Sequence, residues 1–541
     1  MNNAIFGFPR PQNEPILQYL KGSPERAALE EALKKMSSEE IEIPLIIGGK
    51  EIKTGNIGTV VMPHNHKKVL ARYHQAGEKE VQMAIDAALA AKEKWENTPW
   101  TERAAITLRA AELLSKKYRY VINAATMLGQ SKNIFQAEID SACETIDFLR
   151  YNAHFASELY KDQPGSITNQ LNRMEYRPLE GFVFSLSPFN FTAIASNLNM
   201  IPVLMGNVTL WKPSSTAILS NYYLMKVYKE AGLPDGVINF IPGKGSVLGK
   251  VITNHKSLAG IHFTGSTATF NTLWKNVADN TDNYISYPKL IGETGGKDFV
   301  FAHNSASPLE LATALVAGAF EYQGQKCSAA SRAYVPKSIW EDVKKHMLSH
   351  ISKIKIGDVQ DFDKFMNAVI DEASFDNIIN YINFAKQSKE CEIISGGNGD
   401  KSTGYFIEPT IILTTNPHFK TMEEEIFGPV LTIYVYEDGK FEETLDICNT
   451  TSPYGLTGAI FSNDKYVTLH MFDKLRYAAG NFYINDKPTG AMVGLQPFGG
   501  SRASGTNDKA GSFLNLIRWT NPRAIKETFI PATEIIYPYM K

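Results

Sequence analysis

Cysteine is scarce in this 541-residue sequence, which contains only Cys143, Cys327, Cys391 and Cys448. None of the four belongs to a Cys-x-x-Cys pair or stands beside a histidine cluster, so the spacing predicts neither disulfide bonds nor a metal site. His64 and His66 flank Asn65, but without a third ligand nearby this stretch is interpreted as a solvated loop. Reducing, intracellular surroundings fit this cysteine usage best.

Long apolar runs and an excess of either charge are also missing. No run approaches the ~18 residues that span a bilayer, and 55 Lys and Arg residues face 57 Asp and Glu residues. A net charge of −2 offers no basic surface to nucleic acid or to an anionic membrane, so neither partner is expected. The first 40 residues contain several acids and no basic start before an apolar core, which argues against a transit or signal peptide. The cytoplasm is the expected compartment.

The length exceeds what one hydrophobic core supports, so two or three domains are expected. Helical runs are predicted at 27–36, 79–97, 100–120 and 124–160, the last interrupted at least once. Between Gly181 and Phe263 apolar strands alternate with helices. This alternation predicts a parallel sheet with helices on both faces and ligands at the carboxyl ends of the strands.

A second strand–helix series covers residues 290–484 and predicts a second α/β domain. Residues 166–175 have no obvious core face and are interpreted as part of a projecting hairpin used in subunit contact. The stretch 513–519 is predicted to be a short strand, followed by a proline-containing arm.

Two stretches of this second series carry candidate catalytic residues, a carboxylate in the first and a thiol in the second. Glu293 stands before a Gly-Gly turn at the end of an apolar strand, and Cys327 follows 34 residues later in a polar, glycine-broken loop. A nucleophilic thiol needs a low pKa and an open approach, and a carboxylate in a dry pocket can act as its general base. A lone cysteine is usually a small buried hydrophobe and a lone glutamate a solvated surface group. Together, with both flanks, they indicate a catalytic pair.

Two strand ends in the first series could receive a nucleotide. The glycines at 243, 245 and 249 miss the Gly-x-Gly-x-x-Gly spacing by one residue, so the ordinary dinucleotide fingerprint is absent and the stretch could be a plain turn. The next strand ends at Thr264-Gly265-Ser266, which opens a helix whose N-terminal amides could accept a pyrophosphate.

With these pieces in order, the chain resembles the aldehyde dehydrogenase superfamily over essentially its whole length. The motifs that carry the resemblance are Ser187-Pro-Phe-Asn190, Trp211-Lys-Pro-Ser214, Phe263-Thr-Gly-Ser266, Glu293-Thr-Gly-Gly-Lys297, Gly324-Gln-Lys-Cys327 and Glu425-Ile-Phe-Gly-Pro429. Phe191, the run Glu321–Ser328 and the run 494–509 resemble the branch of the superfamily that oxidises L-glutamate γ-semialdehyde to L-glutamate in proline degradation.

The resemblance implies an α/β fold with three parts: a Rossmann-type NAD-binding domain (1–162 and 181–292), a catalytic domain (293–512) and a small β oligomerisation flap with a C-terminal arm (163–180 and 513–541). It implies a homodimer or higher homo-oligomer and NAD as the cofactor. It assigns catalysis to Cys327, Glu293 and Asn190. It assigns cofactor binding to Ser187, Lys212, Gly265, Ser266, Glu425 and Phe427, and substrate binding to Phe191, Ser328, Gly490, Ala491 and Phe498.

Several alternatives stay open on the sequence alone. Asn190 could be a helix N-cap, Lys212 a surface lysine, and the acids before Ile426 a solvated face. Another aldehyde, such as succinic semialdehyde, could be the substrate, and the chain could be a catalytically silent binding protein. Papain-like proteolysis also uses a cysteine, but the strand–helix units and the glutamate base favour dehydrogenation.

Overall fold

The computed structural model describes residues 7–541, and its first sheet has seven strands in the order β11-β10-β7-β8-β9-β2-β3. These strands are β2 (Leu45–Ile47), β3 (Lys50–Ile52), β7 (Phe182–Leu186), β8 (Thr209–Lys212), β9 (Ile238–Phe240), β10 (Leu258–Thr264) and β11 (Lys289–Glu293). β7 to β11 run parallel, whereas β2 and β3 form an antiparallel hairpin at the edge. The predicted strand–helix alternation is therefore confirmed. Because β7 to β11 are parallel, their carboxyl ends lie at the same edge of the sheet.

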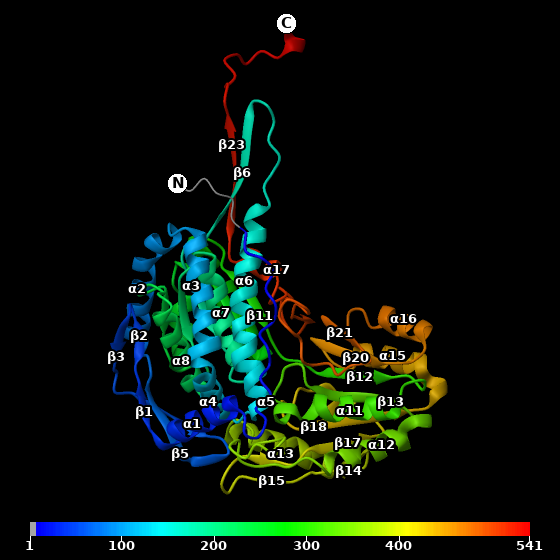
Figure 1. The fold of residues 1–541 in the computed structure, drawn as a ribbon. Coiled ribbons are helices and arrows are strands. Elements are labelled where there is room, and N and C mark those ends of the chain that lie inside the picture. The colour runs from blue at the N-terminus through cyan, green and yellow to red at the C-terminus, as the bar shows by residue number, and fades with distance from the viewer. Residues whose placement is uncertain (1–6) are drawn as a thin grey trace.

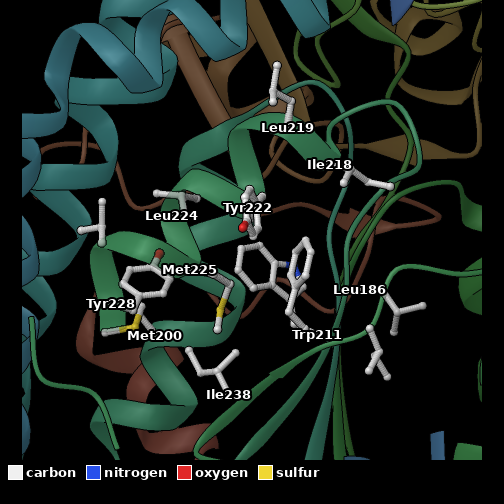
Figure 2. Packing of buried hydrophobic residues seen from close by; sticks show 14 of the residues in the cluster. Leu186, Met200, Trp211, Ile218, Leu219, Tyr222, Leu224, Met225, Tyr228 and Ile238 are labelled. Carbon is white, nitrogen blue, oxygen red and sulfur yellow. The ribbon is translucent and has the colours of Figure 1, made fainter. Parts of the chain in front are cut away.

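Helices cover this sheet in two groups. They are α2 (Glu78–Glu96), α3 (Trp100–Leu113), α4 (Arg119–Gln130), α6 (Glu144–Lys161), α7 (Thr192–Leu204), α8 (Ile218–Glu230), α9 (Gly245–Thr253) and α10 (Thr267–Ala278). α7 and α8 pack together, with α3 and α6 outside α7, while α2, α9 and α10 pack in sequence. Figure 2 shows the core beneath α8, where Tyr222 and Met225 lie near Trp211 and Tyr228 lies beside Met200.

The second sheet has the order β14-β17-β18-β13-β12-β20-β21. Its strands are β12 (Asp298–Ala302), β13 (Ala330–Pro336), β14 (Cys391–Ser395), β17 (Thr410–Thr414), β18 (Val430–Tyr436), β20 (Thr457–Phe461) and β21 (Asn481–Ile484). Its helices are α11 (Pro308–Phe320), α12 (Lys337–Ile351), α13 (Glu372–Lys386), α15 (Phe441–Thr450) and α16 (Lys465–Lys474). α11 and α12 pack on each other. The predicted second strand–helix series is confirmed from β12 onward, whereas its first residues, 290–293, belong to β11 of the first sheet.

The N-terminal part adds α1 (Pro24–Ser38) and a sheet of β1 (Ile41–Ile43), β4 (Ile57–Met62) and β5 (Asn65–His74). Ser23 caps α1 by accepting a hydrogen bond from the Arg26 backbone N–H, as its position before Pro24 predicts. Before α1, the chain lies as an extended arm alongside α6 (Figure 1).

A two-stranded ribbon projects from the body and carries the C-terminus at its far end (Figure 1). It consists of β6 (Gln170–Arg177) and β23 (Asn521–Thr528), paired antiparallel from Gln170 opposite Thr528 to Arg177 opposite Asn521. The predicted hairpin is thus wrong in its pairing, because β6 takes its partner from the C-terminal arm rather than from its own neighbours.

The predicted strand at 513–519 is wrong as well, since this stretch is the helix α17 (Phe513–Arg518). Leu516 and Trp519 are fully buried and lie three residues apart, so a helix places both against the core around α6 and α7. Across residues 7–541, no helix combines the length and the apolar character needed to cross a membrane.

Candidate active site

The loop that presents Cys327 is held in a strained shape. After α11, Tyr322, Gln323 and Gly324 have φ values of 49°, 56° and 65°, in the left-handed region that side chains rarely adopt. The Tyr322 hydroxyl donates to the Gln130 carbonyl (2.8 Å), and the Gln323 amide donates to the Ser131 carbonyl (3.0 Å). A Cβ at Gly324 would lie 2.2 Å from the Gly428 carbonyl oxygen, so only glycine fits there.

Asn190 lies against this loop. Its side-chain amide Nδ2 donates to the Gln325 carbonyl at 3.0 Å, and the residue is buried. The alternative that Asn190 caps a helix is wrong, because the N-cap of α7 is Phe191. A carboxamide has two N–H donors, so this bond leaves one N–H of Asn190 unused.

Glu293 ends β11, and burial raises the pKa of its carboxyl to about 8 although Lys509 opposes the shift. Burial also raises the pKa of the Cys327 thiol well above its usual range, and Glu293, Asp298 and Glu425 add to the rise. This raised pKa of Cys327 is opposite to the low pKa that a nucleophilic thiol needs. In the protein alone the thiol is protonated at neutral pH, so it must lose its proton to a base or gain a positive neighbour in order to react.

One cavity of about 290 Å³ brings the catalytic pair together with the predicted substrate residues. Its lining includes Cys327, Glu293, Phe191, Ser328, Gly490, Ala491 and Phe498. Ser328 and Thr489 are both buried, and the Ser328 hydroxyl donates to Thr489 Oγ1 at 2.9 Å. The Thr489 hydroxyl proton is then available to a group in the cavity. Gly490 is exposed with φ of 93°, which suits a loop whose backbone approaches a ligand closely.

All the predicted cofactor residues lie outside this cavity. Four of them, Ser187, Lys212, Gly265 and Ser266, lie at the carboxyl ends of β7, β8 and β10. Ser187 accepts a hydrogen bond from the Trp211 indole (3.0 Å), and burial lowers the pKa of the Lys212 ammonium at the end of β8. Lys212 is thus a half-buried strand-end residue rather than a surface lysine.

The start of α10 supplies the residues that fit a phosphate-containing cofactor. The Thr264 hydroxyl is buried and makes no hydrogen bond within residues 7–541, and Ser266 caps α10. A Cβ at Gly265 would lie 2.8 Å from the Phe263 ring. The turn therefore accommodates glycine but no larger residue, and no side chain covers its backbone. A hollow of about 420 Å³ continues between α9 and α10. The open groove beside the N-terminus of α10 suits a dinucleotide, while the Thr264 hydroxyl lines the Cys327 cavity and the Gly265 N–H donates to the Glu293 carbonyl at 3.2 Å.

Glu425 and Phe427 stand on the catalytic-domain side. The Gly296 backbone N–H donates to Glu425 Oε1 at 2.8 Å, and burial raises the pKa of the Glu425 carboxyl to about 7. Glu425 therefore faces the Gly-Gly turn after Glu293, whereas Glu424 is exposed, so only part of the acidic run is a solvated face. Phe427 has φ of 58° and packs edge-on against Phe189, with ring centroids 5.7 Å apart.

Sequence reasoning missed a set of buried charges around the cavity. Lys132 is fully buried, forms an ion pair with Asp140 at 2.5 Å, and lies 4.1 Å from the Phe191 ring centroid and 4.2 Å from that of Tyr322. Burial and Asp140 raise the pKa of the nearby Glu144 carboxyl, which also lines the cavity. No local motif marks these residues, since they come from a helical stretch whose polar positions look like any solvated face.

Comparison with known proteins places this geometry in a family. The model of the aldehyde dehydrogenase family matches residues 52–525. A protein of Dictyostelium discoideum named "Delta-1-pyrroline-5-carboxylate dehydrogenase, mitochondrial" is 54% identical over 99% of this chain and 97% of its own length. A human protein of the same name is 49% identical over 98% of this chain and 94% of its own.

A solved structure of a protein with nearly the same name is also similar to this chain. The crystal structure of the Delta-pyrroline-5-carboxylate dehydrogenase from Mycobacterium tuberculosis bound with NAD superposes with a TM-score of 0.96 and 48% identity, and covers 100% of both chains. The family match spans both sheets and the site between them, and these relatives cover nearly the whole chain. The chain belongs to the aldehyde dehydrogenase family.

Proposed function

We propose that this protein oxidises L-glutamate γ-semialdehyde, the open form of Δ1-pyrroline-5-carboxylate, to L-glutamate with NAD⁺, as in the second step of proline degradation. The observation that carries the proposal is the single cavity in which Cys327 and Glu293 face the Ser328–Thr489 pair and the Gly490 loop. The names of the similar proteins from Dictyostelium and human support the same substrate.

In the proposed mechanism Cys327 attacks the aldehyde carbon as a thiolate and forms a thiohemiacetal. The free N–H of the Asn190 amide and the Cys327 backbone N–H donate to the resulting oxyanion, and one such donor contributes about 2.7–4 kcal/mol to transition-state stabilisation. When bound, NAD⁺ accepts the hydride that leaves this carbon. Glu293 then takes a proton from water, which hydrolyses the thioester and frees glutamate.

The chain would hold NAD⁺ at the strand ends of the first sheet. Lys212 would contact the adenosine ribose, Gly265 and Ser266 the pyrophosphate at the start of α10, and Glu425 with Phe427 the nicotinamide ribose and ring. Ser187 would border the same groove. The close packing at Gly265, which leaves no room for a side chain, and the groove between α9 and α10 support this arrangement.

Cofactor choice gives the first prediction. Members of the superfamily that prefer NAD⁺ often carry an acid three residues after the ribose lysine, but this chain has the exposed Ser215 there. Without a carboxylate, a 2′-phosphate is not repelled and Lys212 can pair with it. We expect NAD⁺ to be preferred with measurable use of NADP⁺, and Ser215→Glu to suppress NADP⁺ use selectively. The measurement is kcat/KM for both cofactors, and equal efficiency or complete rejection of NADP⁺ by the unaltered protein contradicts the prediction.

The substrate carboxylate gives the second prediction. Ser328, Thr489 and the backbone N–H groups of Gly490 and Ala491 would receive it, while Phe191 and Phe498 enclose the aliphatic middle. A hydrogen bond to a charged group contributes about 1.5–3 kcal/mol, so Ser328→Ala should lower kcat/KM for glutamate semialdehyde by about 10- to 150-fold. Pentanal has the same carbon count without the charges, and its kcat/KM should hardly change. An equal loss on both aldehydes, or a preference for pentanal in the unaltered protein, would remove the substrate assignment.

Assembly and compartment complete the proposal. The β6–β23 ribbon and the exposed Ile530, Ile535 and Tyr539 beyond it support a homodimer or higher homo-oligomer, which light scattering of the purified chain would test.

We retain the cytoplasm as the predicted compartment, although the names of the Dictyostelium and human relatives include the word mitochondrial. Imaging of the tagged full-length protein in its own cell tests this.

A further inference from the structure

The N-terminal arm is anchored on the wall of the cavity by Glu14. The Glu14 carboxylate is buried and accepts hydrogen bonds from Ser115 Oγ (2.7 Å), Arg119 Nη1 (2.5 Å) and Arg150 Nη1 (2.6 Å). Its backbone N–H donates to Asp147 Oδ1 on α6 at 2.7 Å. Glu14 and Ile16 line the cavity that contains Cys327, so the arm is part of that cavity's wall.

From this anchor, Asn13 joins the arm to two other parts of the chain. Its Nδ2 donates to Asp147 Oδ2 at 2.8 Å and to the Val493 carbonyl at 2.9 Å, and its Oδ1 accepts from the Tyr151 hydroxyl at 3.2 Å. Both amide hydrogens and the amide oxygen are therefore engaged. Arg10 makes a second hydrogen bond from the arm to a backbone carbonyl of this loop, since its Nη2 donates to the Gly494 carbonyl at 2.7 Å.

The loop that receives these bonds needs outside support. Gly490 and Gly494 have φ values of 93° and 79°, and glycine gives a chain much conformational freedom to lose. The Val493 side chain is buried among Phe148, Tyr151 and Ala193. A Cβ at Gly494 would lie only 2.2 Å from the Tyr151 ring, so no side chain fits at this position. Packing thus fixes the side chain of Val493, and the arm fixes the two carbonyls beside it.

We propose that Asn13 and Arg10 are positioning residues for the carboxylate-binding loop 489–494, so that the N-terminal arm sets the preference of the site for an anionic substrate. The inference rests on the proposed function, because the loop has this role only if it receives the substrate carboxylate. Neither residue touches the reacting atoms. By holding Val493 and Gly494 in place, they direct the Gly490 and Ala491 N–H groups, a few residues upstream, towards the cavity.

The test uses the full chain and three aldehydes of five carbons. Glutamate semialdehyde carries both charged groups, 5-oxopentanoate only the carboxylate, and pentanal neither. The variants are Asn13→Leu, which has a similar size and branching, removes both donors and adds no charge, and Arg10→Ala. Gln12→Ala is the matched control, because Gln12 is exposed and belongs to the same arm.

We expect Asn13→Leu and Arg10→Ala to raise KM for both carboxylate substrates by about 2- to 13-fold, the range for a lost hydrogen bond, with kcat nearly unchanged. Their kinetics on pentanal, and all kinetics of Gln12→Ala, should match the unaltered protein. Thermal unfolding of each variant reports on the fold. Arg10 is exposed, so Arg10→Ala keeps the test available if Asn13→Leu is unstable.

Failures of the two proposals look different. If Ser328→Ala discriminates between the carboxylates and pentanal but the arm variants do not, the carboxylate site stands and the role of the arm is overturned. If the arm variants lose efficiency equally on all three aldehydes, the arm is a structural support only, and the inference is again overturned. If Ser328→Ala itself does not discriminate, the carboxylate site is lost and the role of the arm with it.

Discussion

Replacing Cys327 by alanine should abolish aldehyde oxidation, with kcat falling by at least roughly 1,000-fold for every aldehyde tested. In the proposed mechanism the thiol forms the covalent intermediate, and neither the Asn190 amide nor Glu293 would replace an attacking sulfur. NAD⁺ binding should persist, because the predicted cofactor residues lie outside the cavity that contains the thiol. Initial rates of NADH formation and a separate titration with NAD⁺ measure the two effects.

Cys391→Ala is the matched control for this prediction. Cys391 is a half-buried free cysteine on β14, at the edge of the second sheet, and its removal should leave the rate unchanged. A thiol-reactive probe should label Cys327 in the unaltered protein, at a rate that changes when NAD⁺ is present. Substantial activity in Cys327→Ala would refute the nucleophile assignment, and a Cys327 that stays unreactive with and without NAD⁺ would favour a catalytically silent protein.

Glu293→Gln should separate the two halves of the reaction. A general base contributes about 10²- to 10⁴-fold, so steady-state turnover should fall by that factor because hydrolysis of the thioester slows. Hydride transfer should be less affected, which gives a rapid burst of about one NADH per active site followed by a slow phase. Stopped-flow absorbance records both phases. A variant that shows no burst while turning over slowly would mean that Glu293 serves mainly to activate the thiol.

The pH dependence of the hydrolysis step gives an independent measure of Glu293. Burial raises the pKa of this carboxyl to about 8, and only the ionised form can accept a proton from water. The rate of hydrolysis should therefore rise with pH up to about 8 and level off above it, whereas Glu293→Gln should lose this rise. A rate that is independent of pH between 6 and 9 in the unaltered protein would contradict the role of Glu293 as the base.

The catalytic pair was predictable from the sequence because its signal is local. Glu293 sits at a strand end before two glycines, and Cys327 sits in a glycine-broken loop after an apolar helix, so a few neighbouring residues specify each position. Strand and helix periodicity likewise predicted that β7 to β10 alternate with helices along the chain and placed Lys212 and Gly265 at strand ends. The preference of Cys327 for the protonated form could not be read in this way, because it depends on burial and on three carboxyls brought from elsewhere in the chain.

The sequence by itself therefore determined the strand–helix order and led to the proposal of Cys327 as nucleophile and Glu293 as base, since each follows from residues close together along the chain. Only the tertiary structure decided that β6 pairs with β23, that 513–518 is a helix and that Asn13 holds the carbonyl of Val493. The pairing and the Asn13 contact join segments hundreds of residues apart, which no local pattern encodes. Residues 513–518 are apolar enough for a strand or a helix, and the burial of Leu516 and Trp519 on one face selects the helix.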